Sequence, residues 1–145
     1  MLPHMIDPAG PSSRITQPPL LAWASLMVFR QTGDREWAKD CLHPLRRYLE
    51  WDAQNRDHNE NGIPEWHVEG EPLCRCGESG LDNSPAYDRG DVLDAPDFAG
   101  YLCNDFRSLA VLAKELGEVA LVREANAVSD RLPAAVEDNL WSDRL

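Results

Sequence analysis

Residues 17–32, QPPLLAWASLMVFRQT, decide the fold class of this chain. Wound as a helix, the stretch carries apolar side chains on nearly every side, which is typical of a helix with neighbours all round. Pro18 and Pro19 suit its first turn, and Gly33 suits its C-terminal cap. The sequence therefore predicts a buried helix over residues 17–32.

Three more helices are expected. Asp34 is a suitable N-cap for the second, in which apolar residues recur at helical spacing with charged residues between them. Helical periodicity returns from Phe98 to Gly117, and again in a fourth segment with one apolar face, where Pro133 could introduce a kink. Buried and amphipathic helices in alternation are typical of concentric helical layers. The prediction is an all-α domain over residues 1–145, with two helical hairpins that cannot close a ring by themselves.

A long segment, residues 56–93, separates the two hairpins. It is rich in Asn, Asp, Gly, Glu and Pro and shows no sustained periodicity, so we expect a loop. Trp66, Leu81 and Tyr87 within it indicate that the loop is ordered. Loops of this length inside a compact domain are usually functional when they are ordered.

Net charge and hydropathy limit the kinds of molecule that this chain could bind. The net charge of −11 repels nucleic acid and anionic membranes, whereas a neutral sugar is a suitable ligand. The longest apolar stretch, residues 19–29, is shorter than the roughly 20 residues that span a bilayer. The N-terminus lacks the features of a secretory signal, so the predicted location is cytoplasmic, unless truncation has removed a signal.

The four cysteines, Cys41, Cys74, Cys76 and Cys103, show no disulfide framework, and we expect them to be reduced. A zinc site from Cys74, Cys76 and a histidine such as His67 is an alternative. Its cysteines have one residue between them, which is not the spacing of common zinc-binding pairs.

A calcium-like pattern begins at residue 57, DHNENGIPE. Asp57, Asn59 and Asn61 would supply side-chain oxygens, Ile63 a carbonyl and Glu65 a carboxylate, and a glycine provides a sharp turn. The match to an EF-hand is partial, because the twelfth position does not hold glutamate. The alternative is an Asn-rich turn whose side chains satisfy its own backbone N–H groups.

Residues 76–88, CGESGLDNSPAYD, bring two carboxylates into one tight polar stretch. Cleavage of a glycosidic bond by inversion needs one carboxylic acid to protonate the leaving oxygen and a distant carboxylate to activate water. Glu78 and Asp82 are candidates for the acid. By chemistry alone, ordinary loop acids that hold turns are the more common case.

Residues 78–85, ESGLDNSP, resemble the signature of glycoside hydrolase family 63, whose processing α-glucosidases and bacterial relatives act on α-glucosides and α-mannosides; trehalases carry a similar segment. Residues 17–24 resemble the start of an inner helix of that fold, and residues 57–65 resemble a calcium loop of some members. Residues 97–102 resemble the helix after the acid, and residues 140–141 resemble the end of an outer helix. The resemblance spans nearly the whole chain in the correct order.

The resemblance implies part of an (α/α)6 toroid with a sugar pocket at the ends of its inner helices. The family's general acid falls on Asp82, while Glu78 would bind sugar hydroxyls or orient its neighbours. Other residues implied at the pocket are Asn83, Tyr87, Gln17 and Trp66, the last as a stacking surface for a sugar ring. No cofactor is expected for the chemistry, and calcium would be structural.

Departures from the family pattern concern the substrate contacts and the base. Gly77, Ala86 and Ala99 stand where the family often has an aromatic, a bulky or basic residue, and asparagine. No residue matches the family's downstream general base. We therefore expect a fragment of an inverting α-glycosidase, inactive alone, that needs the remainder of its catalytic domain or self-association to cover its apolar faces. The alternative is a non-catalytic helical module that binds a carbohydrate or a protein.

Overall fold

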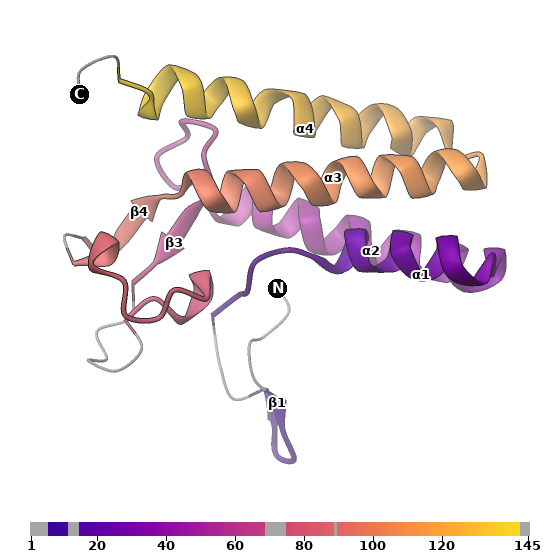
Figure 1. Cartoon of the computed structure of the whole chain (residues 1–145), viewed down its shortest axis with the longest axis horizontal. Helices are drawn as coiled ribbons and strands as arrows, with labels where there is room; N and C mark the ends of the chain where they lie inside the picture. The colour runs from indigo at the N-terminus through magenta and orange to yellow at the C-terminus, as the bar shows by residue number, and fades with distance from the viewer. Residues whose placement is uncertain (1–5, 12–14, 69–74, 89, 143–145) are drawn as a thin grey trace.

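The computed structural model describes residues 6–11, 15–68, 75–88 and 90–142. Within these ranges the helices are α1 (Leu21–Thr32), α2 (Arg35–Asn55), α3 (Pro96–Leu116) and α4 (Val119–Leu140). The short strands are β1 (Ile6–Asp7), β2 (Gly10–Pro11), β3 (Glu65–His67) and β4 (Val92–Asp94), and two 3-10 turns are η1 (Gly77–Ser79) and η2 (Pro85–Tyr87). The predicted fold class is confirmed: the chain is all-α, with two helical hairpins joined by a long ordered loop as in part of a toroid (Figure 1).

Each hairpin turns at a glycine that the sequence identifies. Gly33 and Gly117 have φ angles of 66° and 87°, in the left-handed region where a side chain would be strained. The Asp34 side chain then accepts a hydrogen bond from the Trp37 N–H at 3.0 Å, which confirms the predicted N-cap. These two turns set each helix antiparallel to its neighbour.

The first helix begins at Leu21, later than the predicted position 17. Each residue that precedes a proline is disfavoured in the helical region, so Pro18 and Pro19 keep residues 17 and 18 extended. The segment is also held by tertiary contacts, because the Gln17 carbonyl accepts a hydrogen bond from the Tyr48 hydroxyl at 3.3 Å.

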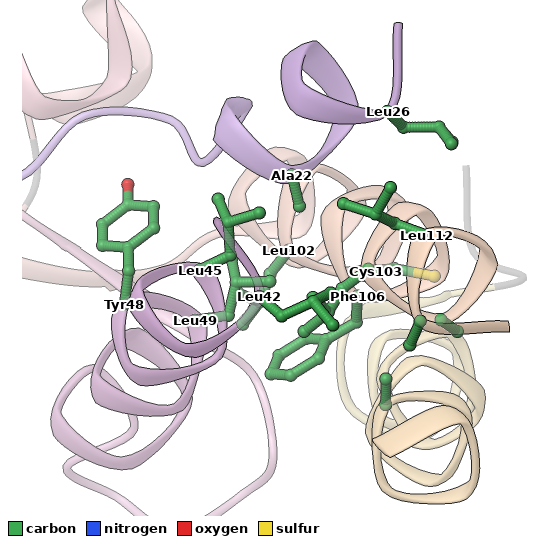
Figure 2. Close-up of a cluster of buried hydrophobic side chains, with 14 of the residues drawn as sticks. Ala22, Leu26, Leu42, Leu45, Tyr48, Leu49, Leu102, Cys103, Phe106 and Leu112 are labelled. Carbon is green, nitrogen blue, oxygen red and sulfur yellow. The ribbon is translucent and has the colours of Figure 1, made fainter. Parts of the chain in front are cut away.

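The prediction that α1 is buried on all sides is wrong for the described residues. Ala22 and Leu26 are its buried residues, whereas Leu21 and Trp23 are 44% and 46% exposed. The helix contacts α2 and α3 on one side, so its other side faces solvent. α3 contacts all three other helices and forms the middle of the core (Figure 2).

Asp105 of α3 holds the start of α1. The N-cap residue, Leu20, makes no capping hydrogen bond through its own side chain, and the Asp105 carboxylate instead accepts hydrogen bonds from the Ala22 and Trp23 N–H groups, both at 2.9 Å. Burial of this carboxyl raises its pKa, while the two N–H donors favour its charged form. A buried anion at a helix N-terminus also interacts favourably with the helix dipole.

Asp105→Asn should destabilise the chain by about 2 kcal/mol, since the amide has one acceptor oxygen in place of two and leaves a backbone N–H unpaired at a buried helix end. The free energy of unfolding from urea titration measures this loss. Asp130→Asn, at an exposed position of α4, is the matched control and should change it little. Equal effects of the two substitutions would contradict the capping role.

The loop between the hairpins is ordered, as predicted, and contributes to a second buried cluster. β3 and β4 pair antiparallel, with Glu65 opposite Asp94 and His67 opposite Val92. Trp66 stacks on Phe98 with ring centroids 3.9 Å apart, and this second cluster also buries Cys76, Tyr87 and Ala95. The strands are three residues long, too short for alternation to be visible in the sequence.

Two simpler expectations concern the cysteines and the membrane. Cys41, Cys76 and Cys103 are free thiols that form no disulfide bond, and Cys74 lies outside the described residues. In the part of the chain that the structure describes, no helix is both long and apolar enough to cross a membrane.

Candidate functional site

Asp82 lies on an exposed turn whose backbone is held by hydrogen bonds with Ser79 and Cys76. The Ser79 hydroxyl donates to the Cys76 carbonyl at 2.9 Å and accepts from the Leu81 N–H at 3.0 Å. The Cys76 N–H donates to the Asp82 carbonyl at 3.2 Å, and Gly80 has a φ of 72°. Residues 81–83 are exposed as a result. The loop thus presents one carboxylate outward on an ordered backbone.

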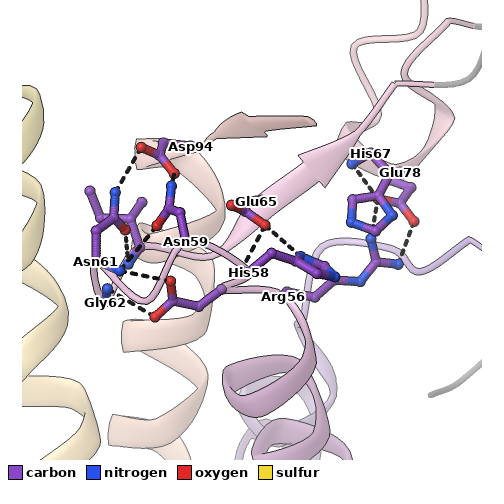
Figure 3. A network of polar contacts seen from close by, with 11 residues as sticks. Arg56, His58, Asn59, Asn61, Gly62, Glu65, His67, Glu78 and Asp94 are labelled. Atoms are coloured by element: carbon purple, nitrogen blue, oxygen red, sulfur yellow. Dashed lines mark hydrogen bonds and ion pairs between the residues drawn. The ribbon is translucent and has the colours of Figure 1, made fainter. Parts of the chain in front are cut away.

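Glu78, four residues earlier, points the other way and is fully buried. Arg56 binds it through two nitrogens, with Nη1 2.9 Å from Oε2 and Nη2 2.6 Å from Oε1. The backbone N–H groups of Thr16 and His67 also donate to its oxygens, both at 3.0 Å. The Glu78 carboxylate therefore joins four segments: the N-terminal segment, the end of α2, β3 and the loop over residues 76–88 that carries Asp82, here called the acid loop (Figure 3).

This placement decides between the two roles expected for Glu78. Both oxygens are already used by four donors inside the protein, so a sugar hydroxyl could bind only by displacing one of them. Orientation of the neighbouring segments is the role that matches the geometry.

Gln17 lies beside the acid loop. Its side-chain Nε2 donates to the Gly77 carbonyl at 2.9 Å. Tyr87 is 8% exposed, and burial raises the pKa of its hydroxyl. Asn83 is exposed next to Asp82, and its carbonyl accepts a hydrogen bond from Arg75 at 3.4 Å. These three residues and Asp82 belong to one region, with Asn83 on its outer surface.

Trp66 requires a correction. The expected role was to offer a ring face to a sugar, but the ring is fully buried and stacked on Phe98. Its Nε1–H donates to an Asp97 oxygen at 3.0 Å. Trp66 therefore packs β3 against the start of α3, because alternation along the strand turns it inward.

Asp52 is a buried carboxyl group that was not predicted from the sequence. It lies on α2 at the spacing of Leu45, Tyr48 and Leu49, so helical periodicity could have identified it as inward-facing. Burial raises the pKa of Asp52 to about 7, although the positive charge of Arg56 acts in the opposite direction. Neither carboxyl oxygen has a hydrogen-bond partner among the described residues.

Asp52 should accordingly contribute a loss of stability as the pH rises from about 4 to about 7. A carboxyl whose pKa is raised by folding binds its proton more tightly in the folded state, so its contribution is full below the unfolded pKa and is lost as pH passes the folded one. Asp52→Asn should remove a pH-dependent loss of about 3 kcal/mol between these pH values. Urea unfolding at about pH 4.5 and about pH 7.5 tests this. Asp40→Asn, exposed on the same helix, should keep the wild-type pH dependence.

The structure brings only some of the predicted calcium ligands close together. Asp57 accepts hydrogen bonds from the Asn61 and Gly62 N–H groups at 3.0 and 2.9 Å, and the Asn61 amide oxygen accepts from the Ile63 N–H at 2.9 Å. Glu60 and Gly62 take positive φ angles of 59° and 85°. The loop is thus closed by its own side chains, as the turn interpretation predicts.

Two of the predicted calcium ligands gather around a carboxylate that the sequence did not identify. The Asn59 and Asn61 amide nitrogens donate to the Asp94 oxygens at 3.0 and 2.8 Å (Figure 3). Glu65 faces His58 instead, with its Oε2 2.6 Å from the His58 Nδ1. The oxygen donors therefore fit a hard cation only if Asp94 replaces Glu65. Asp94 comes close through the β3–β4 register, which sequence spacing does not reveal.

Apolar grooves lie on the helices. A groove of about 580 Å³ between α3 and α4 is lined by Ala99, Cys103, Leu132, Val136 and Trp141 among others. A second one lies along α1 and α3 and includes Leu20, Trp23 and Tyr101. Neither groove is lined by Asp82, and only the second includes a residue of α1, Trp23.

An ordered polar loop with one outward carboxylate, carried between helical hairpins, is compatible with acid catalysis at a sugar. No solved structure matches the chain. A family model described as the mannosylglycerate hydrolase MGH1-like glycoside hydrolase domain matches residues 1–145, and the chain therefore belongs to this glycoside hydrolase family.

Proposed function

We propose that this chain is the acid-bearing part of an inverting glycoside hydrolase that cleaves α-glucosides or α-mannosides, with Asp82 as the general acid. The observation that carries the proposal is the contrast between Asp82, which is exposed, and Glu78, which is buried and holds the loop in place. A proton donor must be held precisely by residues that do not themselves react. The name of the matching family makes α-mannosides of small organic acids, such as mannosylglycerate, the first substrates to test.

The general base is proposed to come from another part of the catalytic domain. Inversion needs a carboxylate on the far side of the sugar, about 6.5–9.5 Å from the acid, to activate water. Glu78 is unsuited to this role, because Arg56 and two backbone N–H groups occupy its oxygens. The 145 residues alone should therefore be inactive.

Membership of family 63 itself, a cytoplasmic location and a structural calcium ion are further parts of the proposal. For calcium, the supporting observation is the oxygen-rich loop around Asp57, Asn59 and Asn61, with Asp94 nearby. The ion would fix the loop and take no part in the chemistry.

One observation favours a second candidate, a non-catalytic module that binds a carbohydrate or a protein. Large apolar side chains on α1 are exposed, and apolar grooves lie along α1 and α3 and between α3 and α4. Such surfaces often mark interaction sites. In the enzyme proposal, the remainder of the catalytic domain or a second copy of the chain covers them.

Hydrolysis of a panel of α-glucosides and α-mannosides, including mannosylglycerate, distinguishes the glycoside hydrolase from the non-catalytic binding module. The panel is offered to the 145-residue chain and to the complete catalytic domain. We expect activity from the complete domain alone, and proton NMR should show the β-anomer as the first product. First release of the α-anomer would contradict inversion. Inactivity of both proteins, together with saturable sugar binding, would favour the binding module.

A further inference from the structure

Three metal-ligating side chains converge beside β3. Glu65 and His67 are two residues apart on the strand and so share one face, opposite Trp66. His58 folds back from the preceding turn, and its backbone N–H donates to Glu65 Oε2 at 3.0 Å. The rings of His58 and His67 are 5.1 Å apart (Figure 3). One ligand atom from each of the three side chains lies within 4.8 Å of the others.

His67 carries an atom that the fold leaves unexplained. Its Nε2 is buried and has no hydrogen-bond partner among the described residues. A buried imidazole nitrogen without a partner is costly unless something binds it.

We propose that His58, Glu65 and His67 form a site for a divalent transition cation, zinc in the first place. Two imidazoles and one carboxylate are a known zinc donor set, in which water takes the fourth position. Zinc bonds of about 2.0–2.2 Å place tetrahedral ligands about 3.3 Å apart, so the three atoms need to move by roughly 1 Å. His58 can make this movement, because its side chain is 57% exposed.

The donor chemistry separates this site from the oxygen-rich loop nearby. Imidazole nitrogen suits zinc and related transition metals, whereas calcium prefers oxygen ligands alone. The positive charge of Arg56 is neutralised by its two contacts with Glu78, and the net charge of −11 attracts cations. Cys76 is a weaker candidate ligand, because burial raises the pKa of its thiol.

The site has a structural consequence for the acid loop. His67 is bonded through its backbone N–H to Glu78, the residue that holds this loop. An ion shared by His58, Glu65 and His67 would fix the turn before β3 to the strand itself. It would thus stabilise the segment that supports Glu78.

Cobalt(II) titration of the metal-free 145-residue chain tests the proposal, with zinc as the competitor. We expect one equivalent of cobalt to give visible d–d absorption typical of a four-coordinate site, and zinc to displace it. His58→Asn and His67→Asn should each weaken cobalt binding at least about tenfold, because each removes one of three protein ligands. His43→Asn, which alters an exposed histidine of α2, is the matched control and should bind like the wild type. Circular dichroism confirms that each variant is folded.

Three results would overturn the site. Unchanged cobalt affinity in both His58→Asn and His67→Asn would exclude these residues as ligands. An ultraviolet thiolate charge-transfer band that disappears in Cys76→Ser would place the metal on cysteine. Displacement of cobalt by calcium, together with loss of binding in Asp57→Asn, would assign the metal to the oxygen-rich loop.

Discussion

Replacing Asp82 by asparagine should lower kcat of the complete catalytic domain on an unactivated α-mannoside by about 10²- to 10⁴-fold. Asparagine fills the same volume at an exposed position, so the fold should be unaffected. It has no acidic proton, and the leaving alkoxide would have to depart without protonation. Steady-state kinetics on the wild type and the variant measure the loss.

The leaving group distinguishes a lost acid from a damaged site. An activated aryl mannoside needs little protonation of its leaving oxygen, so Asp82→Asn should retain much more of its activity on that substrate. Asp91→Asn is the matched control, since Asp91 is an exposed carboxylate farther along the same loop. An equal loss on both substrates would remove Asp82 from the role of proton donor.

The helices were predictable because their signals are local. Asp34 as N-cap and Gly33 and Gly117 as helix ends were all placed by residue type and spacing. The burial of α1 was not predictable in the same way. Periodicity shows that a helix is apolar on all sides, but whether neighbours cover those sides depends on which other helices are present.

The site was predictable only where its residues lie close in sequence. The segment from Glu78 to Pro85 identified Asp82, but nothing in it shows that Glu78 turns inward to Arg56, which lies 22 residues earlier. Asp94, to which the sequence assigned no role, bonds the asparagine turn where Glu65 was expected, because the β3–β4 register brings Asp94 to that turn. Such long-range pairings follow from the tertiary fold and leave no spacing pattern in the sequence.

Removal of the Glu78 carboxylate should have the largest effect on stability. Glu78→Ala leaves the Arg56 guanidinium buried without its anion, and it also leaves the N–H groups of Thr16 and His67 without an acceptor. Breaking a buried ion pair from one side typically costs about 3–5 kcal/mol. Urea unfolding of the 145-residue chain, with a stabilising osmolyte where the variant is unfolded in buffer, measures the loss. Glu50→Ala breaks the Arg46–Glu50 pair on the surface of α2 and should cost far less.

A double substitution separates the charge from the hydrogen bonds. Arg56→Met combined with Glu78→Leu removes both charges and keeps apolar volume, which is often close to neutral for an isolated buried pair. Here the double variant should recover only part of the loss, because the Thr16 and His67 N–H groups remain unpaired. Full recovery would show that the pair is dispensable and that Glu78 does not join these segments. Partial recovery, with Glu78→Gln intermediate, would identify the carboxylate as the acceptor that holds the acid loop against β3 and the N-terminal segment.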